Sequence, residues 1–345
     1  MHSWSVPLGQ MEIAPYDHYS SFVAHYRLWP RRVLRWRNQA NQLAAAHDVV
    51  VIRHPSPMVS VAARAARRQG KPLVMMVMSN VAMTDRVLGN SGMVAKLYLG
   101  LAKLMVAQEV SCAKKAKRVY AYSKLLAHRH RYCRGRVTLM QDPMLSEKDF
   151  FERVDTCQSD EVRLLRVSWI QPLKGLEYLL EAQAMLLNQG YRVRLEIVGR
   201  ERTANHQRKL EEQSQVLGIH KSVKFSGWIP YDRIHEAYAR SDIQVISSLT
   251  EGTPRCIAEG AARGLPLVST KAGGCADVLT HEVNALLVEP ADPRAMAEAI
   301  ERLIKDGEMR REIIKNGYAY AREATFEILG RRFLGELSEI AREAQ

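Results

Sequence analysis

Two glutamates, Glu251 and Glu259, stand eight positions apart in the stretch SSLTEGTPRCIAEGAARGLPLVST, which covers residues 247–270. A Gly-Thr-Pro at 252–254 follows the first and is typical of a helix start. Because a helix N-terminus is positive and offers free N–H groups, it suits a phosphate, and carboxylates accept hydrogen bonds from sugar hydroxyls. The pattern therefore favours a nucleotide sugar, with its phosphates at the helix start and its ribose and hexose on the two glutamates. A helix with acidic residues near its start is the plainer alternative.

The elements that must position these carboxylates are a buried strand and the helix after it. An apolar run at 243–247 predicts the strand, Thr253 the N-cap, and Pro254 the first helical turn. Gly264 is expected to end the helix, and Pro266 prevents its continuation. The first glutamate would then lie just before the helix and the second inside it.

Short apolar runs alternate with helical patterns along the second half of the chain, which indicates β-α-β units and a parallel sheet. The strands expected there cover residues 163–168, 192–198, 222–226, 243–247, 265–269 and 285–288. The expected helices cover 176–188, 206–217, 231–240, 255–263, 293–305, 308–323 and 326–344. The first half predicts strands at 47–53, 71–78, 118–123 and 136–140, and helices near 57–69 and 92–117.

The length of 345 residues favours two domains. A polar stretch at 146–160 marks the boundary. We therefore predict an α/β protein of two Rossmann-like, doubly wound domains that face each other across a cleft. Ligands of such sheets bind at the carboxyl ends of the strands.

Charge is distributed unevenly along the chain. Residues 1–150 hold 23 Lys and Arg against 8 Asp and Glu, whereas the whole chain has a net charge of +13. The segment RLWPRRVLRWR at 27–37 interleaves five arginines with two tryptophans, and further basic residues cluster at 114–118. The apolar segment 92–108, with Lys96 and Lys103 on one helical face, suits either an interface or a core. The asymmetry indicates a polyanionic partner such as an anionic membrane surface, and a solvated basic face is the plainer alternative for each cluster. Nucleic acid is a weaker alternative, because no motif supports it.

Other bulk features bound the setting. No apolar run is long enough for a transmembrane helix, and the N-terminus lacks a signal-peptide pattern. Five scattered cysteines without C-x-x-C spacing argue against a disulfide framework or a zinc site and favour a reducing cytoplasm.

Several ordered motifs resemble the retaining GT-B glycosyltransferases of family 4, also called glycosyl transferases group 1. The stretch around the two glutamates resembles their E-x7-E signature, and the likeness extends over nearly all of 163–323. The matching segments are VSWIQPLKGLEYLLEA (167–182), LEIVGRER (195–202), VKFSGWIP (223–230) and STKAGGCADVLTHEVNALLVEPADP (269–293). The resemblance implies an acceptor-side domain at 1–155, a nucleotide-sugar-binding domain at 156–325, and a helix at 326–345 that crosses back to the first domain.

The resemblance also implies roles for single residues. Lys174 would grip the donor diphosphate, Glu251 would contact the donor sugar, and Glu259 would hold the ribose. The other implied donor-binding positions are Gly252, Thr253, Pro254, Gly199, Arg200, Gly227, Trp228, Ile229, Gly273 and Gly274. The plainer alternatives are a solvated loop lysine at Lys174, core packing of Trp228, and an ordinary turn at 273–274.

The implied reaction is transfer of a hexose from a UDP- or GDP-sugar to a glycan or lipid-linked acceptor, with retention at the anomeric carbon. The transition state would be oxocarbenium-like, so a cation on the leaving diphosphate matters more than a strong nucleophile. Neither a cofactor nor a metal is expected. A nucleotide-sugar epimerase or hydrolase, and a non-catalytic protein that binds nucleotide sugar or membrane, are the alternatives.

Three positions depart from the family pattern. Trp169 stands where the family usually has an arginine five residues before the lysine, and Arg200 or Arg202 is the hypothetical substitute. The chain reads Met-Ser-Asn at 78–80, where the family often has a histidine. Only 46 residues precede the strand at 47–53 and they contain no Gly-Gly loop. We therefore expect either an internal start codon or a first domain without its usual first β-α unit.

Overall fold

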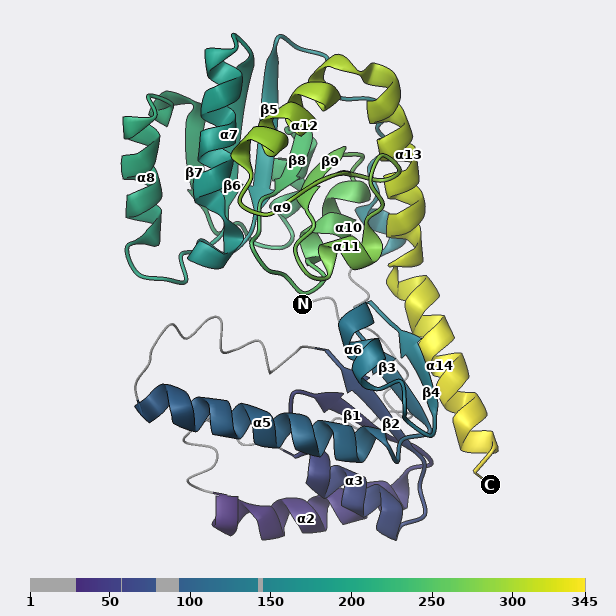
Figure 1. The fold of residues 1–345 in the computed structure, drawn as a ribbon. Helices are drawn as coiled ribbons and strands as arrows, with labels where there is room; N and C mark the ends of the chain where they lie inside the picture. Colours follow the sequence, from purple (N-terminus) through teal and green to yellow (C-terminus); the bar gives the residue numbers. More distant parts are fainter. Residues whose placement is uncertain (1–28, 57, 79–92, 142–144, 345) are drawn as a thin grey trace.

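The computed structural model describes residues 29–56, 58–78, 93–141 and 145–344, except for the side chains of 29–32 and 93–98. Two parallel sheets organise these residues into two α/β domains (Figure 1). The first sheet has the order β1-β2-β3-β4 and contains β1 (Val50–His54), β2 (Leu73–Val77), β3 (Arg118–Ala121) and β4 (Arg136–Leu139). The second has the order β10-β9-β8-β5-β6-β7 and contains β5 (Glu161–Val167), β6 (Arg192–Val198), β7 (Val223–Gly227), β8 (Ile243–Ile246), β9 (Leu267–Thr270) and β10 (Leu286–Val288).

Helices cover both faces of the first sheet. The elements of this domain are α2 (Trp29–Ala46), α3 (Val59–Arg68), α5 (Met93–Ala113) and α6 (Lys124–Arg129). Val59 of α3 and Cys112 of α5 pack against Ile52 and Met75 of the strands, so these helices cover one face. The other face is covered by a helix that comes from the far end of the chain.

That helix is α14 (Phe326–Arg342), which continues from α13 (Gly307–Glu323) and runs along the first domain (Figure 1). Its Ile340 packs against Val74 and Tyr120 of the first sheet. Its Glu336 lies 2.7 Å from Arg118 of β3. The C-terminal segment thus ties the two domains together.

The second sheet is covered on one face by α7 (Leu176–Asn188) and α12 (Pro293–Lys305), which bury Leu179 and Ile300. The other face carries α9 (Ile234–Ala239), α10 (Arg255–Ala261) and α11 (Cys275–Val278), while α8 (His206–Val216) lies beside α7 (Figure 1). Short 3-10 turns at Glu147–Asp149, Pro172–Lys174 and His220–Ser222 connect elements.

Most element boundaries follow the sequence pattern. The bounds of α7 and α12 equal the expected ones, whereas β9 begins only at Leu267. The expected strand at 265–269 included Pro266, which has no N–H to donate to a sheet. Among the described residues α2, α6 and α11 were not predicted as structural helices. The apolar face of α2 explains its stability, because Trp36 is buried against Met58 and Val61.

Candidate donor site

Two loops at the carboxyl ends of β5 and β8 are bound to each other through their backbones. Leu249 N–H donates to the Leu173 carbonyl (2.9 Å), and Ser247 Oγ donates to the Lys174 carbonyl (2.8 Å). Gly175 has φ +56°, and a Cβ there would lie 2.3 Å from the Ser247 carbonyl oxygen. Glycine therefore permits an approach that any other residue would prevent. The loops hold the predicted lysine and glutamate at a fixed separation.

Lys174 and Glu251 form a direct ion pair at this edge of the sheet. The distance between Nζ and Oε1 is 2.5 Å, and the two side chains are 13% and 11% exposed. Ser248 Oγ also donates to the same carboxylate oxygen (2.8 Å). The structure thus brings together the residues that the resemblance assigned to the donor diphosphate and the donor sugar.

Arg166 is a residue that the sequence analysis missed. It lies on β5 with no exposed surface, and its Nη2 donates to Ser248 Oγ (2.6 Å) and lies 3.8 Å from Glu251 Oε1. Nε and Nη1 have no hydrogen-bond partner among the described residues. An arginine between Leu165 and Val167, inside an apolar strand pattern, is the signal that could have found it.

Glu259 lies inside α10 and is only 9% exposed. Its Oε2 accepts a hydrogen bond from the Tyr238 hydroxyl of α9 (2.8 Å). Burial and the charge of Glu259 raise the pKa of Tyr238 well above its ordinary value, so this hydroxyl stays a donor. The carboxylate is therefore oriented by a buried tyrosine that the sequence did not connect with it.

The start of α10 differs from the expectation. The helix begins at Arg255, as the expected range 255–263 has it, but Pro254 is itself the N-cap. Thr253 does not cap the helix, because its Oγ1 donates to the Tyr122 carbonyl of the first domain (3.4 Å). Gly264 follows the helix with φ +64°, the left-handed conformation expected after a helix end.

The Gly-Gly turn packs directly on the loop that carries Glu251. A Cβ at Gly273, which has φ +51°, would lie 2.0 Å from the Glu251 carbonyl oxygen, and one at Gly274 would lie 2.5 Å from that of Gly252. Gly274 N–H donates to the Glu251 carbonyl (3.2 Å). The two glycines are therefore needed for the shape of this loop.

At the ends of β6 and β7, Gly199 N–H donates to the Gly227 carbonyl (2.8 Å). Trp228 is 56% exposed, so core packing does not explain it. The guanidinium of Arg200 stacks over its ring at 4.4 Å. Ile229 is half-buried against the cluster that contains Tyr238. This edge of the sheet therefore exposes the Trp228 ring, and its neighbour Ile229 packs near the buried Tyr238 that holds Glu259.

Trp169 is also exposed, at 48%, and the guanidinium of Arg202 lies 5.6 Å from its ring centroid. Both arginines that the sequence analysis considered as substitutes for the usual cation therefore stack on tryptophans. Arg166, whose Nη2 lies 3.8 Å from Glu251 Oε1, is a further cation beside that carboxylate.

Contacts between the domains lie next to the donor loops. The Lys124 N–H at the start of α6 donates to Asp277 Oδ2 of α11 (2.8 Å). Figure 1 shows α10 and α11 at the end of the second domain that faces α6. The Thr253 contact with Tyr122 lies at the same junction.

A buried ionic cluster lies at the carboxyl end of β1. His54 Nδ1 and His130 Nε2 lie 2.9 Å and 2.8 Å from the two oxygens of Glu109, and all three side chains are almost fully buried. Burial alone would raise the pKa of Glu109, but the contacts and charges of His130 and His54 outweigh it and lower the pKa to about 2. The family histidine expected after the next strand would fall at 79–80, outside the described residues.

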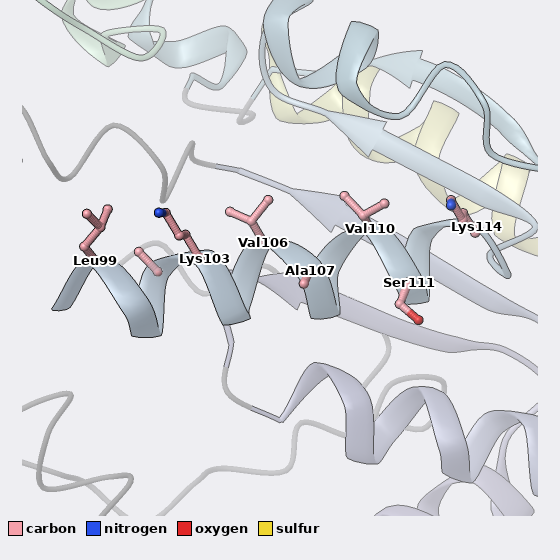
Figure 2. A pocket seen from close by; sticks show the side chains of 8 residues that line it. Leu99, Lys103, Val106, Ala107, Val110, Ser111 and Lys114 are labelled. Carbon is pink, nitrogen blue, oxygen red and sulfur yellow. The ribbon is translucent and has the colours of Figure 1, made fainter. Parts of the chain in front are cut away.

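A cavity of about 580 Å³ lies along α5, separate from the Lys174–Glu251 pair (Figure 2). Its lining combines apolar side chains with a lysine toward each end, and Figure 2 shows Lys103, Val106, Val110 and Lys114 on the same side of the helix. The full lining is Leu99, Ala102, Lys103, Val106, Ala107, Val110, Ser111 and Lys114.

The two basic segments are less free than their sequences suggested. In 27–37, Trp36 is buried, and residues 27 and 28 lie outside the described part. In 114–118, Lys117 and Arg118 pair with Glu343 and Glu336 of α14 at 3.8 Å and 2.7 Å.

Within the described residues, no helix is both long and apolar enough to cross a bilayer. The same part of the chain contains no group of three or more His, Cys, Asp or Glu side chains that could hold a metal ion. All five cysteines are free thiols.

Two domains with parallel sheets, joined by a helix that returns from the second to the first, define the GT-B fold. The structure of Anabaena HepE in complex with UDP superposes with a TM-score of 0.70, at 22% identity over 88% of this chain and 82% of that one. The family model of glycosyl transferases group 1 matches residues 147–320, and the chain belongs to this family.

Some curated relatives match about half of the chain or less. The uncharacterized glycosyltransferase MJ1607 of Methanocaldococcus jannaschii is 31% identical over 170 residues, which are 49% of this chain and 43% of the relative. The lipopolysaccharide core biosynthesis glycosyltransferase LpsE of Rhizobium meliloti is 31% identical over 42% of this chain and 40% of its own. The chain thus spans less than half the length of these relatives.

Proposed function

We propose that the chain is a retaining hexosyltransferase that uses a UDP- or GDP-sugar as donor and a glycan or lipid-linked saccharide as acceptor. The observation that carries the proposal is the Lys174–Glu251 pair, held between two interlocked loops at the carboxyl edge of the second sheet. HepE has been crystallised with UDP and with UDP-glucose, which supports a uridine donor.

In the proposed complex the donor lies across the carboxyl ends of β5 to β8. Trp228 and Arg200 receive the base, Glu259 the ribose, and Lys174 the diphosphate. The loop at 252–254 and the turn at 273–274 enclose the sugar, and Glu251 contacts it. A nucleotide sugar carries its base, ribose and diphosphate in this order. The exposed tryptophan, the oriented carboxylate and the lysine are assigned to them in the same order.

The proposed chemistry replaces one bond at the anomeric carbon by another. The bond to the diphosphate oxygen breaks, and the acceptor oxygen bonds on the same face. Negative charge grows on the leaving diphosphate, and Lys174 stabilises it there. The acceptor hydroxyl releases its proton as the new bond forms, and the departing diphosphate can receive it. The proposed scheme routes no step through a metal.

For the acceptor we propose the first domain. The cavity along α5 offers apolar lining for a lipid chain and lysines for a phosphate, and the relative LpsE is named for lipopolysaccharide core synthesis. Lys114 and Lys115, both exposed, would contribute to docking on an anionic membrane. Sedimentation with phosphatidylglycerol and phosphatidylcholine vesicles tests this. The anionic vesicles alone should bind, and Lys114→Gln with Lys115→Gln should weaken the binding.

The donor proposal is tested by thermal unfolding with UDP, GDP, ADP and their sugar conjugates. A ligand at 100 times its Kd stabilises by about 2.7 kcal/mol, which shifts the Tm by several degrees. One nucleotide should stabilise the wild type, and Lys174→Ala and Glu259→Ala should lose this effect. Lys305→Ala and Glu298→Ala, both on the surface of α12, should keep it.

Three outcomes would contradict the proposal. If no nucleotide stabilises the wild type, the site does not bind a donor. If a nucleotide sugar binds but is neither transferred, hydrolysed nor epimerised, the protein binds without catalysis. Release of free sugar or an epimer without acceptor would instead indicate a hydrolase or epimerase.

A further inference from the structure

Arg166 is a fully buried cation whose guanidinium is only partly satisfied. Its Nη2 donates to Ser248 Oγ, while Nε and Nη1 have no partner among the described residues. Glu251 Oε1 lies 3.8 Å from the same Nη2. A buried charge is costly unless an opposite charge balances it. Glu251 therefore balances Arg166, and Ser248 connects them.

Glu251 is at the same time the partner of Lys174. Lys174 Nζ contacts Oε1 directly at 2.5 Å, and Ser248 Oγ reaches the same oxygen at 2.8 Å. One carboxylate thus faces two cations, so the cluster has a surplus positive charge. Arg166 cannot leave its place on β5, whereas Lys174, 13% exposed on a loop, lies on the accessible side of the carboxylate.

We propose that Arg166 is a positioning residue that keeps Glu251 charge-balanced, so that Lys174 can turn from this carboxylate to the diphosphate of the donor. The inference rests on the proposed function. Without Arg166, the lysine would be the sole counter-ion of a largely buried carboxylate. Binding a diphosphate would then require breaking an ion pair with no replacement, and this cost would weaken donor binding.

The test is a double-mutant cycle on UDP affinity, measured by titration calorimetry. Lys174→Ala should weaken UDP binding about tenfold or more in the wild-type background, since a charge-assisted contact to phosphate is lost. In the Arg166→Met background the same substitution should have an effect at least about threefold smaller, because the lysine there stays on Glu251. Arg166→Lys keeps the charge, so Lys174→Ala should weaken UDP binding in this background almost as much as in the wild type.

Removal of the Glu251 charge should strengthen UDP binding, whereas removal of Arg166 should weaken it. Glu251→Gln releases Lys174 and should tighten UDP binding. In the Glu251→Gln background, Arg166→Met should no longer reduce the effect of Lys174→Ala. A role of Arg166 in folding alone predicts neither result.

Two arginines serve as matched controls. Arg163→Met alters the same strand at an exposed position, and Arg310→Met removes a buried arginine that pairs with Asp155 at 2.8 Å. Both should leave the effect of Lys174→Ala unchanged. If Arg166→Met does not fold, Ser248→Ala takes its place, because it removes the hydroxyl that connects Arg166 with Glu251. It should also make the effect of Lys174→Ala on UDP binding smaller.

The outcomes separate the two proposals. Equal effects of Lys174→Ala with and without Arg166, or unchanged effects in Ser248→Ala, would overturn the role of Arg166 while UDP binding stands. If neither UDP nor GDP nor ADP binds the wild type, the donor site itself is wrong and the role of Arg166 falls with it.

Discussion

Asp277 Oδ2 accepts a hydrogen bond from the Lys124 backbone N–H at 2.8 Å, so a carboxylate of the second domain caps a helix of the first. The same helix, α6, is also capped within its own domain, because Ser123 Oγ accepts from Leu126 N–H (3.2 Å). The start of α6 is therefore shared between the domains. Its position beside the Thr253–Tyr122 contact links domain closure to the donor loops.

Asp277→Ala should loosen the closed arrangement. The substitution removes one interdomain hydrogen bond, worth about 1 kcal/mol at an exposed site. We expect a larger radius of gyration by small-angle X-ray scattering and a lower transfer rate, with nucleotide affinity changed less than twofold or so. Asp292→Ala, which removes the cap of α12 inside one domain, should change neither the radius of gyration nor the transfer rate. An unaltered scattering curve for Asp277→Ala would contradict this role.

Gly273→Ala should damage the donor site more than the fold. Its φ of +51° makes any side chain strained, and its Cβ would displace the Glu251 carbonyl. We expect a loss of about 1–2 kcal/mol from the backbone alone and nucleotide binding weakened beyond detection in thermal shift. Gly218→Ala has φ +72° but nothing within 4 Å of the new Cβ. It should lose similar stability and still bind nucleotide.

Glu109→Gln should change the pH dependence of the free energy of unfolding. The native pKa of Glu109, about 2, lies below its ordinary value of 4.5, so its stabilisation is complete above pH 4.5 and is lost as the pH falls towards 2. The difference in unfolding free energy between wild type and Glu109→Gln should therefore shrink over this range. Urea denaturation at several pH values measures it. The exposed Glu312→Gln should show no such trend, and a parallel pair of curves for Glu109→Gln would contradict the prediction.

Trp228→Ala should weaken binding of the base. Stacking of a base on an aromatic ring is worth about 1–3 kcal/mol, so affinity for uridine and for UDP should fall by about 5- to 150-fold. Trp169→Ala removes a similarly exposed tryptophan that also carries an arginine, and uridine affinity should stay within about twofold. Equal losses in both variants would place the base elsewhere.

The alternation of apolar runs and helical patterns determined most of the second domain from sequence. The expected strand at 192–198 and the helices 176–188 and 293–305 match β6, α7 and α12 residue for residue. Local periodicity suffices there, because each element buries its own apolar face. The N-cap of α10 was assigned to Thr253 instead of Pro254, since Thr253 finds its hydrogen-bond partner in the other domain.

The sequence by itself also singled out Lys174 and Glu251, which meet at the sheet edge, because motif order fixes which loops follow which strands. Only the tertiary structure decided their partners. Arg166 lies 85 positions before Glu251, and Tyr238 and Glu259 come from different helices. Such contacts depend on strand order and on packing across the sheet, which act between distant residues and leave no local pattern along the chain.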